Sequence, residues 1–383
     1  MNRLKRRLRD ESGMSYVFIG LGFMAFLSAS VLAIDVGMLM TARNQAQNSA
    51  DAGALGGAVA LAFDDFDDRS PDGPAVRSAI GAAKANDVMQ GDVSVVPADV
   101  VFLNNEDDIP NRVQVTVYRN DERENPLQLL MARYLRIRDT AGVAATATAE
   151  ASPANAQDCV LPFTIPDRWK EVHTPEFDPN DDFAAFDNKS QPLATPDVYI
   201  GPDDKDNYTG YNPWRDKGVQ VVLKADNGSK LAPSMYQVWD MEGQDRGSDD
   251  VRQAIAGCKK QVLGYNQTFV HKPGLQAGPV EQGIEELIAK DPDAYWDGNK
   301  VVSQYGKSPR VRAIPTFDPH YYDEGKANGR NASLKFVNYL GFFVEELRGQ
   351  EVIGRIVPIA GLIDGSLPDA PPAAFPQAIV LVK

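Results

Sequence analysis

Few residues of this chain have the type and spacing that catalysis or metal binding requires. The 383 residues include three histidines, His173, His271 and His320, and none of them has a partner at metal-ligand spacing. The sequence also lacks nucleophile-elbow, P-loop and dinucleotide-binding motifs. We therefore expect a protein that is not an enzyme, with no cofactor and no catalytic or metal-binding residues.

One acidic segment, FDPNDDFAAFDNK, begins like a calcium-binding loop. Asp178, Asn180 and Asp182 have the spacing of the first three side-chain ligands of an EF-hand. However, Phe183 occupies the position where the loop needs glycine for its turn, and Lys189 replaces the bidentate glutamate. We interpret the segment as a solvated loop, with calcium binding as the weaker alternative.

The two cysteines, Cys159 and Cys258, suit a structural disulfide better than a redox or zinc site. They are far apart in the sequence, and no C-x-x-C motif is present. In an oxidising periplasm or cell exterior we expect them to pair. Two buried free thiols are the alternative.

The N-terminus has the composition of a membrane anchor. Residues 1–9 carry five cations and no acid, and residues 14–34 form an uncharged, strongly apolar run. As a helix this run spans roughly 31 Å, the thickness of a bilayer core. A cleaved secretory signal is the alternative to a retained anchor, but the apolar core of such a signal is shorter than this run. We expect residues 1–13 in the cytoplasm, 14–34 as a transmembrane helix and the rest outside. The overall net charge of −14 argues against nucleic acid as a partner.

The helix is predicted to continue well beyond the membrane. No proline follows until Pro71, and alanine, the best helix former, dominates the sequence. Small residues recur at helical spacing along this stretch: Ala46, Ala50, Ala54 and Ala58, with Gly53 and Gly57 beside them. Such a stripe permits close helix packing. The stripe packs against either a helix of a partner or the protein's own domain, and both kinds of contact can be present together.

Residues 35–151 are predicted to form a small α+β module, in which a short antiparallel sheet packs on helices. Its expected elements after the long helix are a helix at 75–88, strands at 93–96, 100–103 and 112–118, a short helix from Pro126, and a strand at 142–151. Residues 152–158, SPANAQD, read as a linker.

Residues 159–383 are predicted to form a mostly β domain with a few helices. All four tryptophans lie there, together with most of the prolines. The expected strands are 219–223, 235–239, 334–343, 352–362 and 378–382, and the expected helices are 250–260 and 279–289. The fold class as a whole is therefore α+β, with a long membrane-spanning helix first.

Three sequence motifs together resemble the N-terminal domain of the TadE/TadG-like proteins of the tight-adherence (Tad, Flp) pilus machinery. They are AIDVG at 33–37, ARNQAQ at 42–47 and ADAGALGGA at 50–58. The resemblance implies a single-pass inner-membrane protein with a periplasmic body that helps build or anchor a pilus. Its implied partners are the bilayer and other Tad/Flp assembly proteins or pilins. Asp35 and Gly37 then mark the membrane edge, and Asp51 joins the helix-packing residues.

Whether the chain is cleaved at Gly13 distinguishes between two structural roles. Cleaved prepilins carry Glu five residues after the glycine, whereas this chain has Phe18. We therefore expect a retained anchor that acts in pilus assembly through protein–protein contacts. The alternatives are a minor pilin or surface adhesin, or a membrane-tethered periplasmic glycan-binding protein or hydrolase.

Overall fold

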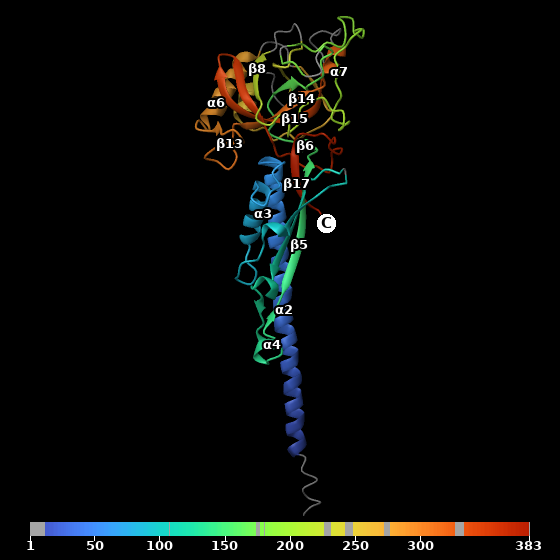
Figure 1. Ribbon diagram of the computed structural model, residues 1–383. Coiled ribbons are helices and arrows are strands. Elements are labelled where there is room, and N and C mark those ends of the chain that lie inside the picture. Colours follow the sequence, from blue (N-terminus) through green and yellow to red (C-terminus); the bar gives the residue numbers. More distant parts are fainter. Residues whose placement is uncertain are drawn as a thin grey trace, which may run out of the picture. The chain divides into compact units, whose positions relative to one another are not determined.

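The computed structural model of the chain describes residues 12–382 except 107, 174–176, 180, 226–230, 242–247, 272–275 and 326–332. The chain divides into two compact units. Unit 1 comprises residues 1–61, 67–150 and 379–383, and unit 2 comprises residues 62–66 and 151–378. Figure 1 labels the main elements of both.

A single helix, α2 (Ser12–Phe63), confirms the predicted long N-terminal helix. It is 52 residues long, and its apolar first part is long enough and apolar enough to cross a membrane. In Figure 1 this part extends beyond the remainder of unit 1 with no other element against it. The second part carries the alanine row and is covered on one side.

A four-stranded sheet with the order β1-β2-β5-β17 covers α2. Its strands are β1 (Val100–Leu103), β2 (Arg112–Arg119), β5 (Val143–Pro153) and β17 (Gln377–Val382). In antiparallel register, Val113 lies opposite Ala149 and Val115 opposite Ala147. These residues are buried and alternate with outward polar ones, which is why the strands present one apolar face. The chain's last strand therefore returns to unit 1.

A second helix, α3 (Pro74–Lys84), buries its own small residues and ends earlier than the predicted Val88. Met89 and Gln90 both have positive φ, and a bridge joins Val88 to Gly91, so the chain turns tightly there. The strand predicted at 93–96 is only one bridge, Ser94 to Tyr118. The short 3-10 helices Pro97–Asp99 and Asp121–Arg123 complete the connections.

The helix predicted from Pro126 is wrong in extent. The segment instead forms a short hairpin, β3 (Leu127–Gln128) and β4 (Thr140–Ala141), around a one-turn helix, α4 (Met131–Tyr134). The turn ends because Arg136 has φ of 55°, and the N–H of Ile137 then bonds back to the carbonyl of Ala132 at 2.8 Å. We call residues 127–141 the foot.

Unit 2 is built on a seven-stranded sheet with the order β11-β15-β14-β7-β9-β8-β16. Because β16 also pairs with β15, six of these strands close on themselves. The strands are β7 (Phe163–Pro166), β8 (Gln220–Ala225), β9 (Met235–Val238), β11 (Thr268–Val270), β14 (Val311–Phe317), β15 (Ser333–Arg348) and β16 (Glu351–Val357). The mostly β prediction is confirmed.

Short elements flank this sheet. They are the helices α5 (Ser248–Ala256), α6 (Ala277–Ala289) and α7 (Pro319–Glu324), and the two-stranded pairs β6 (Ala156–Gln157) with β10 (Leu263–Gly264) and β12 (Tyr295–Trp296) with β13 (Val301–Val302). Aromatic side chains fill the core. The Trp239 ring, for example, lies 4.8 Å from Phe269 and 5.2 Å from Phe336. The predicted pairing of Cys159 with Cys258 is confirmed, because the two form a disulfide with 4.7 Å between Cα atoms.

Residues 152–158, expected as a linker, belong in part to strands. They supply the end of β5 and all of β6. The buried Asn155 holds the segment, since its amide donates to the carbonyls of Asp364 and Pro368 and its oxygen accepts from the Asp364 N–H. The division between the units falls at Glu150 and Ala151.

Candidate functional site

Two of the residues first considered for chemistry, Phe183 and His320, pack against aromatic rings. Among the described residues, no group of three or more His, Cys, Asp or Glu side chains is placed to hold a metal ion. Phe183, at the glycine position of the calcium pattern, is buried with its ring 5.2 Å from Trp169. Asn180 of that pattern lies outside the described residues. His320 packs edge-on against the ring of Phe186, at 4.7 Å.

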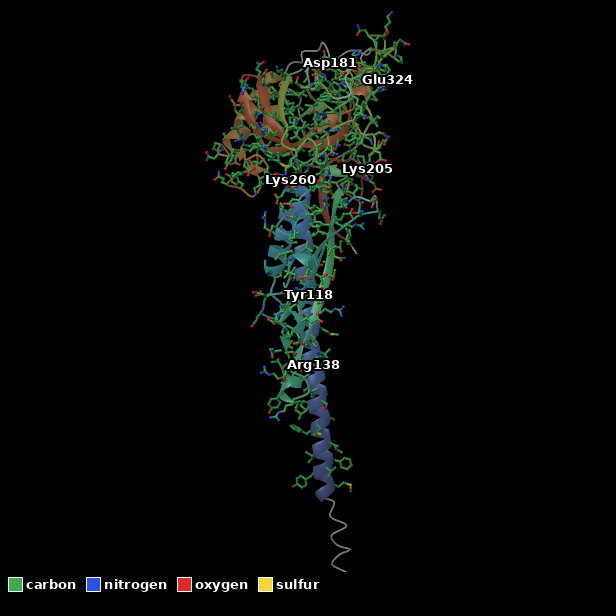
Figure 2. All side chains as sticks on the ribbon, in the orientation of Figure 1. Tyr118, Arg138, Asp181, Lys205, Lys260 and Glu324 are labelled. Carbon is green, nitrogen blue, oxygen red and sulfur yellow. A yellow bond between two sulfur atoms is a disulfide. The ribbon has the colours of Figure 1, made fainter. Side chains whose placement is uncertain are left out.

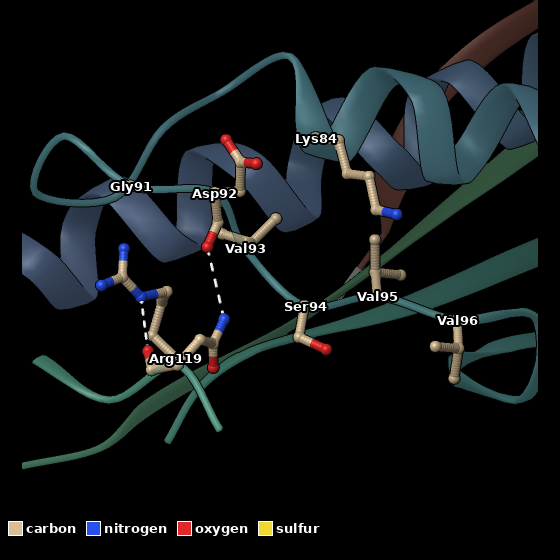
Figure 3. A pocket seen from close by; sticks show the side chains of 9 residues that line it. Lys84, Gly91, Asp92, Val93, Ser94, Val95, Val96 and Arg119 are labelled. Carbon is tan, nitrogen blue, oxygen red and sulfur yellow. Dashed lines mark hydrogen bonds between the residues drawn. The ribbon is translucent and has the colours of Figure 1, made fainter. Parts of the chain in front are cut away.

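A pocket of about 430 Å³ lies in unit 1 between the end of α3 and β2 (Figure 3). Its charged lining residues are Lys84, Arg119 and Asp92. The Arg119 guanidinium already donates to the carbonyls of Val88 and Asn125, each at 2.7 Å. These bonds tie the turn after α3 to the sheet, so Arg119 has a structural role. A second pocket, of about 590 Å³, lies in unit 2 beside Trp296, and both apolar residues such as Ile359 and polar residues such as Lys300 line it.

The predicted helix-packing stripe of α2 packs inside unit 1. Ala46, Ala50, Ala54 and Ala58 are at most 1 % exposed. A methyl group added to Gly57 would lie 2.8 Å from Val113 of β2 and 3.1 Å from Ala79 of α3, and one added to Gly53 would be similarly crowded. The Ser49 hydroxyl donates to the Ala83 carbonyl at 2.9 Å. Glycine and alanine are therefore needed so that α3 and the sheet can approach closely.

The opposite side of α2 is uncovered within the described part of unit 1. Its residues recur every three or four positions and are exposed or half-exposed: Gly37, Thr41, Asn44, Asn48, Ala52, Leu55 and Val59. We call this set the open stripe. It follows the apolar first part of α2 and consists of small, amide and aliphatic side chains. In composition it resembles the faces through which helices contact one another in and beside membranes.

Asp51 and Gly37 lie on or near this uncovered side. Asp51 is half-exposed and accepts a hydrogen bond from the Gln47 side chain at 2.8 Å, one turn earlier. A methyl group on Gly37 would meet nothing within 4 Å. Both are therefore placed where a partner could reach them, unlike the alanine row.

Asp35 holds the foot onto the helix. Its carboxylate accepts three backbone hydrogen bonds, from Leu130 and Met131 at 3.0 Å each and from Ala132 at 2.6 Å. This arrangement caps the free N–H groups at the start of α4. The apolar side chains of the foot also pack on α2, where Leu129, Ala132 and Ala141 cluster with Met38 and Leu39. Asp35 is thus buried rather than solvated.

Two groups of surface residues were not identified from the sequence. The open stripe was obscured because the alanine row is the stronger pattern on the same helix. The exposed residues of the foot, Leu130, Tyr134 and Ile137, fall in the short helix predicted from Pro126. The alternation of these residues with Arg133, Arg136 and Arg138 was the signal available for them.

Comparison with known proteins identifies one part of the chain. A family model described as putative Flp pilus-assembly TadE/G-like (Tad) matches residues 13–60. The match confirms the predicted Tad-type N-terminal segment and covers almost the whole of α2. No curated protein and no solved structure matches the chain.

Proposed function

We propose that this chain is a membrane-anchored, non-enzymatic component of Tad/Flp pilus assembly whose body faces the periplasm. The observation that carries the proposal is the coincidence of the Tad family match with α2. The matched residues coincide with one continuous helix, whose first part is long and apolar enough to span a membrane and whose second part continues beyond that apolar run. Such a helix supports a role in contacts with other proteins at the membrane.

The open stripe is the contact surface that we assign to this role. The alanine row is occupied by α3 and the sheet, so a partner helix must approach from the other side. Small residues such as Gly37 and Ala52 allow a helix axis to come within about 8–10 Å. The amides of Asn44 and Asn48 supply hydrogen bonds across such an interface. Leu55 and Val59 add apolar area at its far end.

Two further features support the orientation. The five cations in residues 1–9 favour a cytoplasmic N-terminus. The Cys159–Cys258 disulfide favours an oxidising compartment for unit 2, because disulfides rarely persist in the cytosol. Both are consistent with a bacterial periplasm.

Deletion of the gene, with surface pili counted, tests the proposal. We expect pili to be lost and to return when the full chain is supplied in trans. Complementation by the full chain is preferable to truncation after unit 1, because β17 completes the unit 1 sheet and comes from the C-terminus. Unchanged piliation in the deletion strain would contradict the assembly role.

A further inference from the structure

We propose that the foot is a second membrane-contact site, which seats unit 1 on the headgroup layer and binds anionic phospholipid. The inference rests on α2 being a membrane anchor and goes beyond the proposed role in pilus assembly. It is carried by three observations on the foot: its level along α2, its exposed apolar side chains and its unpaired cations.

The level of the foot along α2 is fixed by contacts. Its first helical turn is bonded to Asp35, and its apolar residues pack on Met38 and Leu39. The uncharged run ends at Ile34. The foot therefore meets α2 about 1.5–8 Å beyond the end of the apolar span. The headgroup layer on each side of a bilayer is of the same thickness, about 5–8 Å. Figure 1 shows α4 beside α2 at the end of unit 1 from which the helix runs on uncovered.

The foot exposes large apolar side chains at this level. Tyr134 is 82 % exposed, Ile137 70 % and Leu130 58 %. Such exposure is unfavourable in water, whereas tyrosine and aliphatic side chains are stabilised at a membrane interface. Tyr16, near the start of the span, is also exposed and lies about 29 Å from Asp35 along the helix. Tyr16 and Tyr134 are thus placed as the aromatic belts of the two interfaces.

Cations alternate with these apolar residues. Arg133, Arg136 and Arg138 are exposed, and none of them forms an ion pair with any residue that the structure describes. Figure 2 labels Arg138 on this part of unit 1, beside α2. The sequence that follows residues 1–9 is strongly acidic overall, so a local group of three arginines stands out within it. Its charge complements the phosphate groups of anionic lipids.

The depth of single fluorophores in the full chain, reconstituted in nanodiscs, tests the proposal. An environment-sensitive dye is attached to Ile137→Cys, with Met24→Cys as the embedded control and Val270→Cys as the exposed control in unit 2. All three side chains are well exposed in the protein, so the substitutions leave its packing intact. The discs contain phosphatidylcholine alone or mixed with phosphatidylglycerol, and some carry headgroup nitroxide quenchers.

We expect the dye at position 137 to shift its emission to the blue and to be quenched by the headgroup nitroxides, unlike the dye at 270. Quenching by nitroxide-labelled phosphatidylglycerol should exceed quenching by labelled phosphatidylcholine. R136Q/R138Q should reduce this preference by up to about 30-fold, from about 1 kcal/mol per arginine. The charge-matched K260Q/K300Q variant of exposed lysines in unit 2 should leave it unchanged.

Other outcomes would overturn the proposal. A dye at 137 that behaves like the dye at 270 would show that the foot stays in water. A dye at 137 that is shielded but not quenched by headgroup nitroxides would show that protein, such as a second copy, covers the foot. If the emission of the dye at 24 also fails to shift to the blue, the anchor itself is absent, and this result separates failure of the anchor from failure of the foot.

Discussion

The close packing of α2 makes a quantitative prediction about two glycines. A methyl group on Gly57 would lie 2.8 Å from the rigid side chain of Val113 and 3.1 Å from Ala79, whereas one on Gly81 of α3 would meet nothing within 4 Å. Replacing glycine by alanine within a helix gains about 1 kcal/mol in helix propensity. Crowding a well-packed site costs about 1–3 kcal/mol. Gly81→Ala should therefore stabilise unit 1 by about 1 kcal/mol, and Gly57→Ala should leave it unchanged or destabilise it.

The difference between the two variants should be about 1–3 kcal/mol, or roughly 2–12 °C in melting temperature for a unit of this size. Circular dichroism of the purified full chain in detergent follows mainly the helices of unit 1, because α2 and α3 are together longer than α5, α6 and α7 of unit 2. Tryptophan fluorescence provides an internal control, because Trp169, Trp214, Trp239 and Trp296 all belong to unit 2 and should report no change. Equal melting temperatures for the two variants would refute the packing of α2 between α3 and the sheet.

Three further predictions concern other buried contacts. Asp35→Ala removes the acceptor of three backbone N–H groups and should lower the free energy of local opening of the foot by about 1.5–3 kcal/mol. Hydrogen exchange in the foot should therefore accelerate by about 10- to 100-fold. Exchange elsewhere in unit 1 should be unaffected. Replacing Cys159 and Cys258 by serine opens a long loop and should destabilise unit 2 by up to about 4–5 kcal/mol, seen as a lower midpoint of tryptophan fluorescence. Burial raises the pKa of Asp167 to about 6. The folded state therefore binds the proton more tightly than the unfolded state, and unfolding free energy should fall by about 3 kcal/mol as pH rises from about 4 to 6. In Asp167→Asn this pH dependence of the unfolding free energy should disappear, as measured by urea unfolding at several pH values in the same range. A variant whose unfolding free energy changes with pH as in the wild type would contradict the prediction.

The length of α2 was predictable, whereas the partner of its alanine row was not. Composition and the absence of proline before Pro71 are local properties, and they were sufficient to predict a helix of about fifty residues. The four-residue repeat of Ala46 to Ala58 predicts only that another element packs closely against the helix, and it does not identify that element. In the structure that contact is made by α3 and β2, and it leaves the open stripe for a partner.

The foot and the unit boundaries depend on contacts between distant parts of the chain. Asp35 accepts hydrogen bonds from residues almost a hundred positions later. The sequence alone does not reveal this contact, and the local pattern of the foot therefore predicts a short helix. The strand at 378–382 was predicted, but its return to unit 1 was not, because strand composition does not specify a neighbour. Asn155 similarly makes an apparently polar linker into buried structure through its bonds to residues 364–368.

The central claim is that the open stripe of α2 mediates pilus assembly, and a pair of identical substitutions tests it most directly. Ala52 lies on the open stripe and Ala54 is fully buried against unit 1. Ala52→Leu should reach the membrane at the wild-type level, melt within about 0.5 kcal/mol of wild type and yet abolish surface pili in the deletion strain. Ala54→Leu should reduce the amount of folded protein, because overpacking costs about 1–3 kcal/mol. Normal pili with Ala52→Leu at the wild-type protein level would contradict the account.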